Sequence, residues 1–206
     1  IISKITNAKL FLENEASALN IQMEESPKIL HIATHSFYIG DNKDDNLFSE
    51  NIFSNSITKN KRIENPLLRS GIVLAGANYP DKNLKDDGYL TALEVSKLNW
   101  NGTELVVVSG CESGQGDLQS GEGVYGLKRA IAVAGARSSL LSLWEVDDKA
   151  TAEFMESFYI KLKEGQGKAD ALANTQKEFR NSKKYSHPNV WAAFQLSGDW
   201  RSINFD

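Results

Sequence analysis

Five short apolar runs, separated by helix-like segments, constrain the fold of this chain more than any other feature. The runs are KILHIAT (28–34), SGIVLAG (70–76), TELVVVSG (103–110), ARSSLLSLW (136–144) and WAAFQLSG (191–198). Most of them are apolar almost throughout, a pattern typical of strands that are covered on both faces. We therefore expect each run to be a strand of one mostly parallel sheet.

Helical periodicity fills most of the stretches between these runs. One of them opens with Thr91 and Glu94 in capping-box spacing, and another begins with acids and ends with lysine and glycine, as the helix dipole favours. The expected helices are 91–98, 123–136, 147–166 and 168–182. The polar stretches 41–66 and 79–89 are predicted to be surface loops. Strand–helix alternation of this kind predicts an α/β fold whose central sheet is flanked by helices.

Composition narrows the class of protein further. The 206 residues are 41% hydrophobic, and we expect them (1–206) to form a single domain. The net charge of −4 and the lack of a basic cluster larger than KNKR (59–62) argue against a nucleic-acid partner. No apolar stretch approaches the roughly 20 residues that cross a bilayer, so no membrane partner is expected. A single cysteine suits a reducing compartment, and we expect a cytoplasmic protein.

Two residues at strand ends suggest nucleophilic chemistry. In an open α/β sheet, catalytic groups gather beyond the carboxyl ends of the strands. His35 follows the first run and Cys111 follows the third, so neighbouring parallel strands would place them side by side although 76 positions separate them. An imidazole beside a thiol is the arrangement that activates a cysteine nucleophile. The alternative is that Cys111 is a small buried hydrophobe at the end of its strand.

The other candidate motifs are weaker. His31 lies inside an apolar run, where a hydrogen-bonded core histidine is expected, and His187 is expected at the turn before the last strand. Their pattern predicts no metal site. Gly121, Gly123 and Gly126 form a GxGxxG pattern, but a dinucleotide fingerprint follows its strand immediately, whereas about ten residues intervene here. No cofactor is expected.

Several motifs occur together in an order that resembles a known family. These are ILHIATHS, SGIVLAG, DDGYLTALEVSKL, ELVVVSGCESGQGD, GEGVYGLKRAIAVAGARSSLLSLWEVDD and HPNVWAAFQLSGDW. Together they resemble the CHAT domain, a caspase-like domain often attached to TPR repeats, over about residues 28 to 200. The resemblance implies a three-layer sandwich of the caspase type and a cysteine endopeptidase related to caspases, metacaspases and separase. The chain begins without Met and without the upstream strand of that family, so we expect a fragment of a longer protein.

The resemblance also implies roles for individual residues. His35 and Cys111 would form the catalytic dyad, and the backbone N–H groups of Ser36 and Cys111 would stabilise the oxyanion. Asp147 and Asp148, in a separase-like segment, are candidates for binding a basic P1 side chain, the residue before the cleaved bond. The alternative for both is a helix N-cap.

The chain departs from the family pattern at two positions. Ser36 stands where the family has glycine, and serine resists a positive φ if the site needs one. SGCESG replaces the common SACETG, a change between small residues that we expect to be harmless.

Three functions are therefore distinguished at this stage. The first is a cysteine endopeptidase that cleaves a protein or peptide substrate, with a preference for basic P1 as a secondary expectation. It would be regulated by TPR or other domains in the same or a partner chain. The second is a silent or partner-activated interaction module of the same fold. The third is a nucleotide-binding α/β protein that uses Gly121, Gly123 and Gly126.

Overall fold

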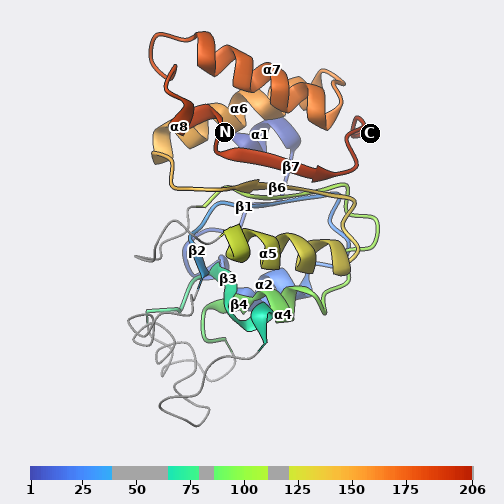
Figure 1. Ribbon diagram of the computed structural model, residues 1–206. Coiled ribbons are helices and arrows are strands. Elements are labelled where there is room, and N and C mark those ends of the chain that lie inside the picture. Colours follow the sequence, from blue (N-terminus) through green and yellow to red (C-terminus); the bar gives the residue numbers. More distant parts are fainter. Residues whose placement is uncertain (39–64, 79–85, 111–120, 206) are drawn as a thin grey trace.

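The computed structural model describes residues 1–38, 65–78, 86–110 and 121–205, and its arrangement is shown in Figure 1. The helices are α1 (Ile2–Thr6), α2 (Ala18–Met23), α4 (Ala92–Val95), α5 (Gly121–Val133), α6 (Asp148–Lys163), α7 (Lys168–Asn181) and α8 (Pro188–Trp191), with short 3-10 turns η1 (Glu13–Glu15) and η3 (Pro66–Leu68). The strands are β1 (Ile29–Ile32), β2 (Ser36–Tyr38), β3 (Ser70–Val73), β4 (Tyr89–Thr91), β5 (Leu105–Val108), β6 (Ser138–Ser142) and β7 (Phe194–Gly198).

The central sheet has four strands in the order β1-β5-β6-β7. β1 and β6 both run parallel to β5, and β7 closes the sheet antiparallel to β6. Helices α1, α6, α7 and α8 lie on one face of the sheet, and α2, α4 and α5 lie on the other (Figure 1). The predicted three-layer α/β architecture with a mostly parallel central sheet is confirmed.

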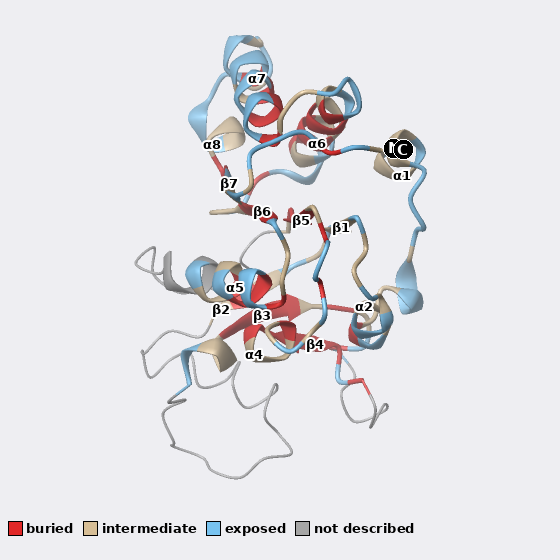
Figure 2. Cartoon of the chain, turned by 90° about the vertical axis from the view of Figure 1, so that its right-hand side faces the viewer, coloured by how far each residue is buried: buried red, intermediate tan, exposed pale blue. Residues whose placement is uncertain are grey.

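Strand β5 is buried along its whole length, as its continuous apolar sequence predicts. Leu105 and Val107 belong to the core beneath α6 and α7, whereas Val106 and Val108 belong to the core on the α5 side. Successive side chains of a strand point to opposite faces, so one strand supplies both cores. Figure 2 shows the buried residues on both sides of the sheet.

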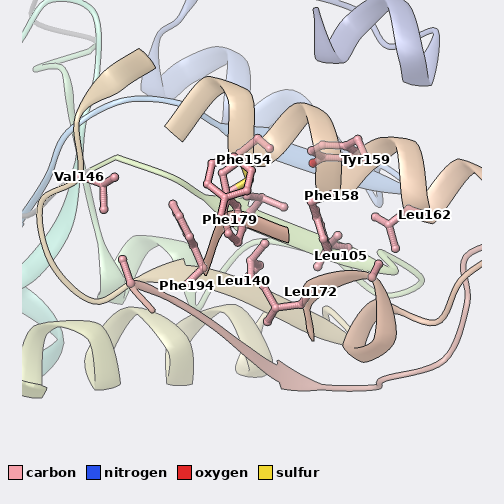
Figure 3. Close-up of a cluster of buried hydrophobic side chains, with 14 of the residues drawn as sticks. Leu105, Leu140, Val146, Phe154, Phe158, Tyr159, Leu162, Leu172, Phe179 and Phe194 are labelled. Atoms are coloured by element: carbon pink, nitrogen blue, oxygen red, sulfur yellow. The ribbon is translucent and has the colours of Figure 1, made fainter. Parts of the chain in front are cut away.

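Aromatic side chains fill the core between the sheet and helices α6 and α7 (Figure 3). The ring of Phe154 stacks on Phe194 of β7 at 4.4 Å between centroids and meets Phe179 of α7 edge-on at 5.0 Å. Offset and edge-to-face contacts at these distances are favourable beyond the burial of area alone. Phe154 therefore joins α6, α7 and β7 in one cluster.

Local signals in the sequence fix several element boundaries. Thr91 caps α4 by accepting the N–H of Glu94, whose carboxylate accepts the Thr91 N–H at 2.8 Å, so the predicted capping box is present. The buried Asp86 carboxylate accepts the N–H groups of Leu19 and Gly88, both at 3.0 Å. That carboxylate joins α2 to the turn that precedes β4.

The run SGIVLAG forms a strand, but its placement in the parallel sheet was wrong. β3 lies in a separate antiparallel sheet of order β2-β3-β4. Its partners are two strands of three residues each, too short to produce a detectable pattern in the sequence. Residues 89–91 form β4, so the predicted loop 79–89 ends before Tyr89. Most of the other predicted loop, 41–66, lies outside the described residues.

The last predicted strand starts later than expected. Residues Pro188–Trp191 form α8, whose N-cap is His187, and β7 begins only at Phe194. Proline at the first helical position favours a helix start there, because its missing N–H has no intrahelical partner to lose. Among the described helices, none is long and apolar enough to cross a membrane.

The aromatic cluster gives the first prediction, which compares two residues of the same helix. Phe154→Ala should lower the free energy of unfolding by about 3–5 kcal/mol, because it removes a fully buried ring that contacts the rings of Phe179 and Phe194. Ile160→Ala, at an exposed position of α6, should change it by less than about 1 kcal/mol. Urea unfolding followed by circular dichroism measures both. Equal losses in the two variants would contradict the assignment of this core.

Candidate active site

The two strands that lead to His35 and Cys111 are parallel neighbours, which is the condition for the two residues to lie side by side. β1 pairs with β5 in parallel, with Ile29 opposite Leu105 and Ile32 opposite Val108. The Ser109 N–H donates a backbone hydrogen bond of 3.1 Å to the Ile32 carbonyl, which continues the pairing past the end of β5. The two carboxyl ends therefore lie at the same edge of the sheet.

His35 lies in the connection between β1 and β2, and its side chain is exposed. Its carbonyl accepts the N–H of Val73 at 2.8 Å, which ties this connection to β3. The hydroxyl of Thr34 donates to the carbonyl of the same Val73 at 2.6 Å. The backbone around His35 is thus fixed by β3 while the imidazole faces solvent.

Gly110 makes a close approach to the same connection. A Cβ added at Gly110 would collide with the Thr34 carbonyl and lie 3.0 Å from the His35 nitrogen. Glycine is therefore the residue that fits here, because any side chain would separate the two backbones. Glycine fits this close approach, and the expectation that SGCESG in place of SACETG is harmless stays a prediction.

The other half of the predicted dyad cannot be placed in the same way. Cys111 lies outside the described residues, and its immediate neighbour Gly110 is the last described residue of that strand end. The dyad therefore stays a prediction.

Ser36 is the first residue of β2 and lies opposite Ile72 in the antiparallel pair. The strand backbone is extended, and Ser36 is not among the described residues with positive φ. Serine at this position therefore carries no left-handed strain. The His35 carbonyl accepts the Val73 N–H, so His35 faces β3 in the ladder of hydrogen bonds. Successive residues of an antiparallel strand direct their N–H groups to opposite sides, so the Ser36 N–H points away from β3.

The two acidic candidates occupy different positions at the start of α6. Asp147 is the N-cap, and its Oδ1 accepts the N–H of Ala150 at 2.9 Å, which confirms the helix-cap interpretation for this residue. Asp148 is the first residue of the helix, and both side chains are exposed. Their role in binding a basic side chain stays a prediction.

His31 is hydrogen-bonded at both ring nitrogens, as expected for a core histidine. Its Nε2 lies 2.9 Å from the hydroxyl of Ser109, and its Nδ1 lies 3.2 Å from the hydroxyl of Tyr159. Burial lowers the pKa of His31 from 6.5 to about 4, so the imidazole is neutral at physiological pH. Sequence reasoning missed both partners, because Tyr159 is 128 positions away and no local pattern connects it to His31.

The glycine-rich pattern belongs to helix α5. Gly121, Gly123 and Gly126 all lie within α5, not in a turn that directly follows a strand. Gly126 packs closely on β3, since an added Cβ would lie 2.6 Å from the hydroxyl oxygen of Ser70. Helix packing therefore explains this glycine. Within the described ranges, no group of three His, Cys, Asp or Glu side chains could hold a metal ion.

Comparison with known proteins identifies similar sequences. The family model of the CHAT domain matches residues 2–199 of the chain. Tetratricopeptide repeat protein 28 of Homo sapiens is 36% identical over 115 residues, and its Mus musculus counterpart is 34% identical over 115 residues. Each match covers 56% of this chain and 5% of the relative, so the chain corresponds to a small part of those proteins.

The lowered pKa of His31 gives the second prediction. The unfolded chain takes up a proton near pH 6.5 and the folded chain only near pH 4, so protonation favours unfolding between these values. The free energy of unfolding should therefore fall by up to about 3 kcal/mol as the pH drops from 6.5 to 4. His31→Gln should remove that part of the pH dependence. His187→Asn, which keeps an N-cap on α8, should preserve it.

Urea unfolding at several pH values between 4 and 7 measures this effect. If the free energy of unfolding changes equally with pH in wild type and in His31→Gln, the assignment of a neutral, buried imidazole is wrong.

Proposed function

The chain belongs to the CHAT domain family, and from this membership we propose that it is a caspase-like cysteine endopeptidase. The proposal assigns His35 and Cys111 as the catalytic dyad. CHAT domains share the caspase-like fold, and the three-layer sheet arrangement of this chain agrees with that fold.

The observation that carries the proposal is the pairing of β1 with β5. Partners in this pair are 76 positions apart, as Ile29 and Leu105 are, and the same interval separates His35 from Cys111 in the sequence. The contact of Gly110 with the backbone at Thr34 and His35 supports the same juxtaposition one residue before the cysteine. Both observations come from described residues and favour a thiol close to the imidazole.

In the proposed reaction, the Cys111 thiolate attacks the carbonyl carbon of the scissile peptide bond, and the electron pair moves to the carbonyl oxygen. When the tetrahedral intermediate collapses, the carbon–nitrogen bond breaks and the leaving amine takes its proton from His35. Water then attacks the thioester, which releases the new carboxyl end and restores the thiol. The exposed imidazole at position 35 is accessible to both the substrate and water.

The proposed oxyanion donors are the backbone N–H groups of Ser36 and Cys111. One preorganised donor of this kind contributes about 3–4 kcal/mol to transition-state stabilisation in a well-studied protease. The extended backbone of Ser36 lets serine serve where the family has glycine.

For the substrate, we propose a protein or peptide with Arg or Lys at P1. Asp147 and Asp148 are exposed at the N-terminus of α6, where two carboxylates can pair with a cationic side chain. Asp147 keeps one oxygen, Oδ2, beyond the Oδ1 that caps the helix.

Regulation by TPR domains, in the same or a partner chain, is part of the proposal. The two similar relatives are named as tetratricopeptide repeat proteins, and this chain spans about 5% of their length. The proposed setting is the cytoplasm, with which a single cysteine is compatible.

The third prediction tests the dyad. A fluorescent peptide acyloxymethyl ketone with Arg or Lys at P1 should label the wild-type chain covalently. Cys111→Ala should abolish labelling, and His35→Ala should slow it by about 100-fold or more, since the thiol loses its acid–base partner. Time-resolved gel fluorescence measures the rates.

His187→Ala is the matched control, because it removes a histidine that is not part of the proposed site and should label like wild type. If the folded wild-type chain is not labelled, with or without added TPR domains, the endopeptidase proposal fails and a silent interaction module takes its place. Labelling that appears only with TPR domains supports the regulated form of the proposal.

The fourth prediction separates the two functions of Asp147 and Asp148. Asparagine caps a helix about as well as aspartate but carries no charge. Asp147→Asn and Asp148→Asn should therefore keep the thermal midpoint within a few degrees and slow labelling by the Arg probe about tenfold each. Labelling by a probe with uncharged Ala at P1 should change by less than about twofold. Equal losses with both probes would contradict a charge-pairing pocket.

A further inference from the structure

Three polar side chains form a hydrogen-bonded chain beneath the strand ends that carry the proposed dyad. His31 of β1 lies at the centre, between Ser109 at 2.9 Å and Tyr159 at 3.2 Å. The imidazole also stacks on the Tyr159 ring, with centroids 5.6 Å apart and planes inclined by 20°. Tyr159 is fully buried in the aromatic core beneath α6, where Figure 3 shows its position.

Each of these three hydrogen-bonded residues belongs to a segment that leads to a proposed site residue. His31 is four residues before His35, and Ser109 is two residues before Cys111. Tyr159 lies on α6, the helix that begins beside Asp147. The hydrogen bonds thus join the three segments of the proposed site at one point inside the fold.

We infer that His31 is a positioning residue of the proposed dyad: its bridge from Ser109 to Tyr159 fixes the end of β5 against β1 and α6. This inference rests on the proposed function. The imidazole of His31 acts through the backbone of the two strand ends and touches neither substrate nor the reacting atoms. It sets the distance between the segments that bear His35 and Cys111.

The chemistry of imidazole makes this bridge sensitive to each partner. A neutral imidazole donates from one nitrogen and accepts at the other, so Ser109 and Tyr159 take complementary roles. Removal of either hydroxyl leaves a buried nitrogen without its partner, and the ring then shifts or admits water. The ring of Tyr159 is fully buried and meets Phe158 edge-on at 5.6 Å between centroids, which opposes a matching shift of its hydroxyl.

Backbone contacts next to the bridge transmit this position to the site. The Ser109 N–H donates to the Ile32 carbonyl at 3.1 Å, and the next residue, Gly110, packs against the backbone of Thr34. A displacement of Ser109 therefore changes the contact at Gly110 directly. Displacements of about 1 Å at a reacting pair can cost about 100-fold in rate.

The experiment uses the only cysteine of the chain as a reporter. The rate of alkylation by iodoacetamide, a small uncharged probe, is measured from pH 5 to 10 by mass spectrometry. Its midpoint reports the thiol pKa, which a neighbouring imidazole lowers below the ordinary value of about 8.5. The variants are Ser109→Ala, Tyr159→Phe and His31→Gln, with His35→Ala to define the dyad.

Thr175→Val is the matched control. It removes a buried hydrogen bond of 2.8 Å within α7, and so costs stability of a similar kind in a helix that carries none of the proposed site residues. Thermal unfolding of every variant is measured alongside the alkylation. A role confined to stability would affect the control and the bridge variants alike and leave all alkylation midpoints unchanged.

We expect Ser109→Ala and Tyr159→Phe to raise the alkylation midpoint by about one pH unit and to slow labelling by the Arg probe by 10- to 100-fold. His31→Gln removes the ring stack and the contact with Tyr159, so it should raise the midpoint at least as much as Tyr159→Phe. Thr175→Val should keep the wild-type midpoint. Tyr159→Phe keeps the ring stack and the apolar core, so its alkylation midpoint tests the positioning role of His31 even if Ser109→Ala does not fold.

Two results would overturn the inference, and they can be told apart. If His35→Ala raises the midpoint while Ser109→Ala and Tyr159→Phe leave it within about 0.2 units, the dyad stands and the positioning role is wrong. If His35→Ala also leaves the wild-type midpoint unchanged, the thiol has no imidazole partner. That second result overturns the proposed dyad together with the positioning role.

Discussion

The burial of strand β5 on both faces is the constraint on which the other layers depend. Its four residues alternate between the two cores, so neither helical layer can shift without breaking contacts to the same short strand. Its two neighbours, β1 and β6, are held in parallel register by the main chain. The edge of the sheet at which His35 emerges is therefore positioned by apolar burial in the centre of the fold.

Much of this fold could be predicted from the sequence because parallel strands buried on both faces leave continuous apolar runs. The partners of a strand leave no such trace. SGIVLAG has the composition of a parallel strand, yet β3 pairs antiparallel with β2 and β4, each of three residues. A three-residue strand is shorter than any window in which a period can be seen, and the N-terminal helices α1 and α2 are little longer.

For the candidate site, too, the sequence predicts what local patterns encode and misses contacts between distant segments. His35 could be selected because it follows a strand, and the capping function of Asp147 because acids precede a helical pattern. The bridge from His31 to Tyr159 could not, since it depends on which helix covers β1. The requirement for glycine at position 110 also arises only from the close approach of two chain segments. Contacts between distant segments are thus the part that the sequence leaves undetermined.

The order of the strands along the chain has a consequence for how the molecule folds. β1 and β5 pair although 76 positions separate them, and the whole of the small sheet lies between them in the chain. The entropy of closing the intervening segment opposes such a distant parallel pair, and non-local pairs of this kind slow folding. A partly synthesised or unfolded chain lacks the pairing that brings the two strand ends together. The proposed thiol chemistry is thereby restricted to molecules that have completed folding.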